Sequence, residues 1–291
     1  MSGTPTDAPA TYGDRLRAAM DQLGPFCPGI DPHAALLEKW GLPDTVAGLE
    51  TFALTCVEAF GGAVASVKPQ SAFFERFGSA GVAVLERTLA GLRDAGTLSL
   101  LDVKRGDIGT TMAGYARAYL SDDSPLRADA ITVSPYLGYE SLRPALDLAA
   151  ATGRGVFVLT LTSNPEGPSV QHATRDGASV AASVVAGVAR DNAAAAATGR
   201  LGSVGMVVGA TVGSAVSDLG LDLTGSAGPL LAPGLGAQGG TAAALRATFG
   251  SALPQVLGTS SREVLVAGPD VVALRDAARR AAHDLTSALA D

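Results

Sequence analysis

Short apolar runs alternate along the chain with longer segments that are rich in Ala, Leu and Arg and have helical period. The apolar runs are almost continuous, which is typical of parallel strands covered by helices on both faces. Each run is followed by a helix-like segment, for example residues 44–60, 71–96 and 268–290. The predicted strands are residues 26–31, 63–69, 98–104, 129–135, 155–163, 203–211, 229–236 and 255–262.

Eight successive strand–helix units predict an α/β fold, a (β/α)8 TIM barrel that forms a single domain over residues 1–291. An open doubly wound sheet is the alternative, but the first strand is not followed by the GxGxxG dinucleotide fingerprint. Residues 10–23 predict an extra N-terminal helix, which we expect to close the floor of the barrel. The polar segment 164–177 is predicted to be a loop long enough to act as a lid.

Composition narrows the class of protein. The chain has 291 residues, of which 47% are hydrophobic and 17% charged, as expected of a globular protein. The net charge of −7 and the absence of a Lys/Arg-rich run argue against a nucleic-acid or membrane partner. The two cysteines, Cys27 and Cys56, form no CxxC motif and no signal peptide is apparent, so we expect buried thiols in a cytoplasmic protein.

Charged residues interrupt the apolar pattern at the end of the third strand. Side chains two apart on a strand share a face, so Asp102 and Lys104 should stand at the barrel mouth above Leu98 and Leu100. Lys68 should enter the same space from the second strand. An isolated ion there would cost several kcal/mol, so these groups must neutralise each other. The predicted array consists of Lys68, Asp102, Lys104 and Asp107. A purely structural ion-pair network at the rim is the alternative interpretation.

The last two strands lead into segments that suit a phosphate. The seventh strand continues into APGLGAQGG (232–240), where glycines allow close backbone approach and Gln238 offers an amide donor. The eighth continues into SSRE (260–263), where Arg262 can form a forked bond. His33 is expected to be an ordinary rim histidine, and no spacing of His, Cys and carboxylates predicts a metal site.

The segments D102-V-K104-R-G-D107-I-G-T-T111, SVK68P, APGLGAQGG and SSR262 together resemble those of the orotidine 5′-phosphate decarboxylase family. The likeness extends in order from Asp31 to Arg262. It implies conversion of orotidine 5′-monophosphate to UMP and CO₂ in pyrimidine biosynthesis, with no cofactor. It also implies a homodimer in which Asp107, Ile108 and Thr111 reach the partner's site.

The resemblance also implies a role for each matching residue. Lys104 protonates C6 of the pyrimidine and Asp102 lies against the departing carboxylate. Lys68 and Asp107 complete the array, and Lys68 and Asp31 also reach the ribose hydroxyls. The implied contacts to the base and the phosphate come from Ser163, Gln238, Gly239, Ser261 and Arg262.

The chain departs from the commoner family pattern in its longer N-terminal segment, its longer stretch after the fifth strand and the sequence T-S-N-P at that strand's end. We therefore expect a divergent, longer branch of the family. The alternatives are a Mg²⁺-dependent phosphosugar decarboxylase or aldolase on the same barrel, a Schiff-base aldolase using Lys104 or Lys68, and an inactive nucleotide-binding barrel.

Overall fold

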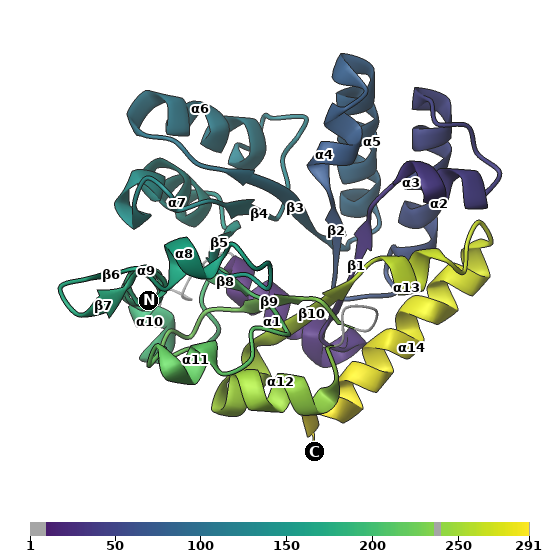
Figure 1. Ribbon diagram of the computed structural model, residues 1–291. Helices are drawn as coiled ribbons and strands as arrows, with labels where there is room; N and C mark the ends of the chain where they lie inside the picture. The colour runs from purple at the N-terminus through teal and green to yellow at the C-terminus, as the bar shows by residue number, and fades with distance from the viewer. Residues whose placement is uncertain (1–9, 236–239, 291) are drawn as a thin grey trace, which may run out of the picture.

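Eight parallel strands close into a barrel in the computed structural model, which describes residues 10–235 and 240–290. The strand order is β1-β2-β3-β4-β5-β8-β9-β10, and β10 pairs with β1 to close the ring. Every strand of the barrel overlaps one predicted run, which confirms the TIM barrel, and the helices surround the strands (Figure 1). The strands are β1 (Phe26–Ile30), β2 (Ser66–Pro69), β3 (Leu98–Arg105), β4 (Ala130–Val133), β5 (Gly155–Leu161), β8 (Val204–Val208), β9 (Leu230–Pro233) and β10 (Val256–Ser260).

Each helix-like segment named from the sequence contains helix in the structure, and one of them is divided. The segment predicted as one helix over 71–96 is two helices, because the left-handed conformation of Gly78 (φ +62°) breaks the helical path. None of the described helices has the length and apolar character needed to cross a bilayer. The helices are α1 (Tyr12–Leu23), α2 (Ala34–Lys39), α3 (Val46–Phe60), α4 (Ser71–Glu75), α5 (Gly78–Asp94), α6 (Gly109–Leu120), α7 (Arg143–Ala151), α8 (Pro168–Gln171), α9 (Val180–Asp191), α10 (Ala193–Ala196), α11 (Ala215–Asp218), α12 (Ala242–Phe249), α13 (Arg262–Leu265) and α14 (Val271–Ala290), with 3-10 turns η1 (Tyr139–Leu142) and η3 (Gly250–Gln255).

Helix α1 closes the floor of the barrel, as predicted. Its buried residues Tyr12, Leu16 and Met20 belong to the apolar cluster that fills the barrel interior. The Tyr12 ring packs edge-on against Phe157 of β5, with the ring centroids 6.1 Å apart. A Cβ at Gly155 would lie 2.4 Å from the Tyr12 ring, so only glycine admits this contact. The second, larger apolar cluster lies between the strands and the surrounding helices.

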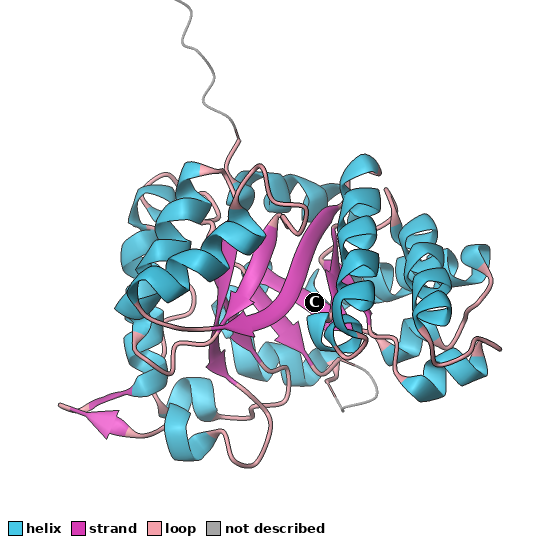
Figure 2. Cartoon of the chain, turned by 90° about the horizontal axis from the view of Figure 1, so that it is seen from above, coloured by secondary structure: helices cyan, strands magenta, loops and turns pink. Residues whose placement is uncertain are grey.

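The segment after β5 is more ordered than a simple loop. It contains α8 and a short antiparallel hairpin of β6 (Thr174–Arg175) and β7 (Ala178–Ser179). The hairpin projects from the body of the molecule (Figure 2). Gln171 anchors α8 to the barrel mouth: its Oε1 accepts the Thr162 N–H at 2.9 Å and its Nε2 donates to Thr162 Oγ1 at 2.7 Å. Whether this segment acts as a lid stays a prediction.

Candidate active site

A cavity of about 340 Å³ opens at the carboxyl ends of the barrel strands. Each of the eight strands, or the residue just after it, contributes to its wall, and the polar groups gather on β1, β2, β3 and β10. The lining residues are Asp31, His33, Lys68, Gln70, Asp102, Lys104, Thr132, Leu159, Thr162, Val207, Leu231, Pro233, Gly234, Leu235, Thr259, Ser260, Ser261 and Arg262.

Asp102 is the centre of the charged part of this cavity. Its Oδ1 accepts hydrogen bonds from Lys104 Nζ at 2.5 Å and from Thr132 Oγ1 at 2.7 Å. Its Oδ2 accepts a longer bond from Lys68 Nζ at 3.4 Å. The side chains of Asp102 and Lys68 are 9% and 8% exposed, whereas that of Lys104 is 46% exposed. Three members of the predicted array therefore meet in one pocket, with two ammonium groups on one carboxylate.

The neighbouring charges decide the ionisation of the buried pair. Burial by itself raises the pKa of Asp102, but the charges of Lys68 and Lys104 and the hydrogen bonds from Lys104 and Thr132 outweigh it and lower the pKa below its usual value. Burial likewise lowers the pKa of Lys68, and the carboxylates of Asp31 and Asp102 reverse that effect and raise it. Both groups are consequently held in their charged forms.

The backbone of β3 is irregular where it carries the two charged side chains. Leu101 pairs with Ile131 and Arg105 pairs with Val133, so the three β3 residues 102–104 lie opposite the single β4 residue Thr132. Lys104 has the left-handed φ of +46°, which costs a non-glycine residue about 1 kcal/mol or more. This bulge differs from the regular strand that the sequence predicts, although Leu98 and Leu100 fill the barrel interior as expected.

Asp107, Ile108 and Thr111 lie away from the cavity of their own chain. Asp107 is half-buried, and its Oδ1 accepts the Ile108 N–H at 2.8 Å. Ile108 is 61% exposed, and Thr111 is an exposed residue of α6. None of the three lines the pocket that holds Lys68, Asp102 and Lys104.

The predicted substrate-binding residues are divided between the cavity and its surroundings. Asp31, Ser261 and Arg262 line it, and the buried Asp31 Oδ1 has no hydrogen-bond partner among the described residues. A Cβ at Gly29 would lie 2.0 Å from Ser261 Oγ, so glycine is needed for Ser261 to pack here. Ser163 is exposed and does not line the cavity, whereas its neighbour Thr162 does. Gln238 and Gly239 lie outside the described residues.

Sequence reasoning missed three polar residues of the wall. Gln70 Oε1 accepts a hydrogen bond from Lys68 Nζ at 3.3 Å, and Thr132 Oγ1 donates one to Asp102. The buried hydroxyl of Thr259 has no hydrogen-bond partner within the described part of the chain. Strand alternation would have revealed Thr132, because Ala130 two residues earlier faces the barrel interior. The same rule would have revealed Gln70, because it follows Lys68 by two residues. His33 is predicted from the sequence to be an ordinary residue of the rim. In the structure it lines the cavity and its ring packs edge-on against Phe73, with the ring centroids 4.5 Å apart.

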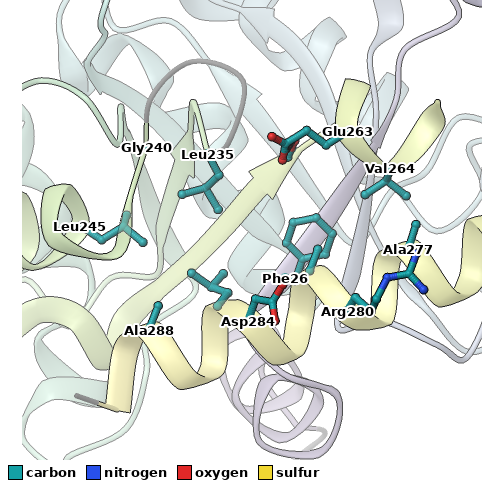
Figure 3. Close-up of a pocket in the computed structure, with 13 residues that line it drawn as sticks. Phe26, Leu235, Gly240, Leu245, Glu263, Val264, Ala277, Arg280, Asp284 and Ala288 are labelled. Atoms are coloured by element: carbon teal, nitrogen blue, oxygen red, sulfur yellow. Dashed lines mark hydrogen bonds between the residues drawn. The ribbon is translucent and has the colours of Figure 1, made fainter. Parts of the chain in front are cut away.

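A second cavity of about 490 Å³ lies outside the barrel, between β10, α12 and α14 (Figure 3). Its floor is apolar, with Phe26 and Leu245, and its rim carries Glu263, Arg280 and Asp284. It contains none of the predicted catalytic residues. The barrel mouth is therefore the candidate active site.

Lysine is unusually concentrated at the barrel mouth. The whole chain contains three lysines, Lys39, Lys68 and Lys104, and two of them line the cavity. Within residues 10–235 and 240–290, no group of three or more His, Cys, Asp and Glu is arranged to hold a metal ion. The lysine and arginine side chains that line the described cavity are those of Lys68, Lys104 and Arg262.

Comparison with known proteins gives consistent matches over nearly the whole chain. The family model described as "Orotidine 5'-phosphate decarboxylase / HUMPS family" matches residues 24–281. An orotidine 5′-phosphate decarboxylase of Salinispora tropica is 62% identical over 280 residues, which are 96% of this chain and 98% of that protein. The enzyme of the same name from Streptomyces coelicolor is 59% identical, with the same coverage of both chains.

Solved structures agree with these sequence matches. A crystal structure of a Streptomyces avermitilis protein has a TM-score of 0.92 and 56% identity, and the match covers 100% of both chains. The structure of the Leishmania donovani OMP decarboxylase has a TM-score of 0.73 and 27% identity, with 97% of this chain and 100% of that one covered.

Proposed function

Because the chain belongs to the orotidine 5′-phosphate decarboxylase / HUMPS family, we propose that it is a carboxy-lyase that converts orotidine 5′-monophosphate (OMP) to UMP and CO₂ in pyrimidine biosynthesis. The description of the family model also names a second group, HUMPS. Relatives at 59–62% identity that match along almost their full length are all decarboxylases, which favours this activity over the Mg²⁺-dependent alternative. The observation that carries the proposal is the Lys68–Asp102–Lys104 cluster at the barrel mouth of such a chain.

The cavity suggests how the substrate lies. Arg262 and Ser261 follow β10 and supply donors for the phosphate, a common arrangement in TIM barrels. The unpartnered Asp31 Oδ1 can accept a ribose hydroxyl beside Lys68. The pyrimidine then extends toward β3, where C6 and its carboxylate meet Lys104 and Asp102. We keep Gln238, Gly239 and Ser163 as proposed contacts of the phosphate loop and the base.

Decarboxylation leaves an electron pair at C6 when the bond to the carboxylate breaks and CO₂ departs. The Lys104 ammonium, held 2.5 Å from Asp102 Oδ1, provides fixed positive charge where this negative charge develops. It then transfers its proton to C6, which yields UMP, and the neutral amine regains a proton from water. Asp102 holds the ammonium in place, so little reorganisation is needed during the reaction.

Phosphate recognition takes place far from the bond that breaks. Binding energy from the phosphate can therefore orient the base and drive closure of surrounding segments without being part of the chemical step. This division predicts that phosphate contacts affect KM and that the lysine–aspartate cluster affects kcat.

We further propose a homodimer in which Asp107 completes the array of the partner subunit. Asp107 is outside its own cavity, next to the exposed Ile108. Tyr136 and Leu137, which follow β4, are 79% and 53% exposed, so apolar surface is available on this side of the barrel mouth. Thr111, on the neighbouring helix α6, would accompany Asp107 into the partner's site. A cytoplasmic location stays a prediction.

The activity is tested by the loss of OMP absorbance and the release of CO₂ with purified protein in the presence of EDTA. We expect turnover by the wild type, and at least a thousandfold loss in Lys104→Ala, because a preorganised charge and the proton donor are both removed. Lys39→Ala, which changes the exposed lysine of α2, is the matched control and should keep wild-type turnover.

Two outcomes would count against the proposal. Wild-type protein without OMP turnover would refute the assigned substrate, and a requirement for Mg²⁺ would favour the phosphosugar alternative. Folded Lys104→Ala with wild-type turnover would refute the proton-donor role while leaving the substrate assignment intact.

A further inference from the structure

Thr132 lies at the junction between the bulged backbone of β3 and the charged cluster. The residue is 1% exposed and is the only β4 residue opposite positions 102–104. Its Oγ1 accepts a hydrogen bond from the Lys104 backbone N–H at 3.0 Å. The same oxygen donates to Asp102 Oδ1 at 2.7 Å.

The direction of these two bonds is fixed by the groups involved. A backbone N–H can only donate, and an ionised carboxylate can only accept. The single hydroxyl proton of Thr132 must therefore point at Asp102. The hydroxyl links the main chain of Lys104 to the side chain of Asp102, two features that a regular strand would leave independent.

The bulge makes this link necessary. Where three β3 residues face one β4 residue, a regular ladder cannot satisfy every backbone group, and a buried N–H without a partner is costly. The Thr132 hydroxyl takes the place of the missing carbonyl for Lys104. It thereby supports the left-handed conformation (φ +46°) from which the Lys104 side chain returns to Asp102.

We propose that Thr132 is a positioning residue for the decarboxylation: it orients the Asp102 carboxylate and stabilises the Lys104 backbone, so that the ammonium faces the reacting carbon. The inference rests on the proposed function. The only proton of the hydroxyl is already directed at Asp102, so Thr132 has none to donate to the substrate and acts through Asp102 and Lys104.

The test compares Thr132→Val with Thr132→Ser. Valine nearly keeps the shape but lacks the hydroxyl, whereas serine keeps the hydroxyl. We expect kcat to fall about 10- to 100-fold in Thr132→Val, because misplacement of catalytic groups by a fraction of an ångström to one ångström has effects of this size. The dissociation constant of UMP should stay within about twofold of the wild type, and Thr132→Ser should recover most of kcat.

Thr160→Val is the matched control. Thr160 is a buried threonine of the neighbouring strand β5 whose hydroxyl donates to the Val158 carbonyl at 3.0 Å. It does not line the cavity, so its replacement should leave kcat unchanged. Should Thr132→Val fail to fold, as judged by circular dichroism, Thr132→Ala provides the same removal of the hydroxyl without a methyl group against the Lys104 amide.

The possible failures are distinguishable. Absence of OMP turnover in the wild type would refute the proposed function and not the role of Thr132. Wild-type kcat in a folded Thr132→Val or Thr132→Ala variant would overturn the positioning role. The positioning role would also be overturned if Thr132→Val lost kcat and UMP affinity to the same extent. A loss of kcat in Thr132→Ser or in Thr160→Val as large as that in Thr132→Val would overturn it as well.

Discussion

The side chains of the charged cluster differ in their exposure to solvent, which indicates the replacements that the fold can tolerate. The cluster consists of Lys68, Asp102 and Lys104. Asp102 and Lys68 are both more than nine-tenths buried, so removing either takes an opposite charge away from a buried partner and should lower the free energy of unfolding. The Lys104 side chain is 46% exposed, and Asp102 keeps Lys68 and Thr132 as partners without it. Replacement of Lys104 should therefore affect turnover far more than stability, whereas replacement of Lys68 affects both.

At the same scale, Arg262→Ala should raise KM for OMP about 10- to 100-fold with little change in kcat, because a charge-assisted bond to the phosphate is lost away from the reacting carbon. Steady-state kinetics at varied OMP concentration measure the two constants separately. Arg280→Ala, which changes an exposed arginine of α14 at the other cavity, is the control and should leave both constants unchanged. An unchanged KM in Arg262→Ala would exclude Arg262 as a phosphate ligand.

At the scale of single elements, helix α1 supports the active site by packing against the floor of the barrel. Helix α1 precedes the barrel in the chain, and its buried face fills the space beneath the interior cluster of the strands. A capping box at Thr11 and Asp14 starts the helix, and the Gly13 N–H donates to Ser203 Oγ at 3.2 Å. The barrel interior is thus packed from its floor to the charged mouth, which leaves the β3 bulge little freedom to relax.

At the scale of this element, Tyr12→Ala should lower the free energy of unfolding by about 3–5 kcal/mol, because a large buried ring and its contact with Phe157 are removed. Tyr12→Phe is the matched variant: it removes only the buried hydroxyl, which has no hydrogen-bond partner among the described residues, and should be neutral or stabilising by about 1 kcal/mol. Urea denaturation followed by circular dichroism measures both. Equal stability of Tyr12→Ala and wild type would show that α1 does not support the barrel.

At the scale of the whole molecule, the position of Asp107 supports the proposed dimer. Three charged groups of the predicted array meet in one cavity, while Asp107 lies outside it beside exposed apolar residues. In the proposed dimer, a second copy of the chain would bring the fourth member of the predicted array, the Asp107 carboxylate. The proposed dimer would therefore contribute directly to the active site.

At this scale, mixing two inactive variants distinguishes a shared site from a self-contained one. Dimers of Lys104→Ala and of Asp107→Ala should each be inactive, but after subunit exchange they should recover about a quarter of wild-type activity, because about half of the dimers are hybrids and each hybrid has one intact site. OMP turnover, with the dimer fraction followed by analytical ultracentrifugation, measures the recovery. If Asp107 acted within its own chain, the mixture would stay inactive.

The sequence by itself determined the architecture and the kinds of group at the site. Strand and helix periods are local properties, so the eight strand–helix units and the helix before the first strand could be identified from patterning alone. The rule that side chains two apart share a face placed Asp102 and Lys104 above Leu98 and Leu100, which the structure confirms.

Only the tertiary structure decided the geometry of the site, because it depends on pairing between strands distant in sequence. The β3 bulge follows from its register against β4, which brings Thr132 to Asp102 and Lys104 across 30 and 28 residues of sequence. The position of Asp107 also depends on tertiary structure. The sequence predicts it in one array with Lys68, Asp102 and Lys104, but the turn into α6 places it outside the cavity of its own chain. A local pattern specifies which side chains a strand offers, whereas contacts between strands specify which of them meet.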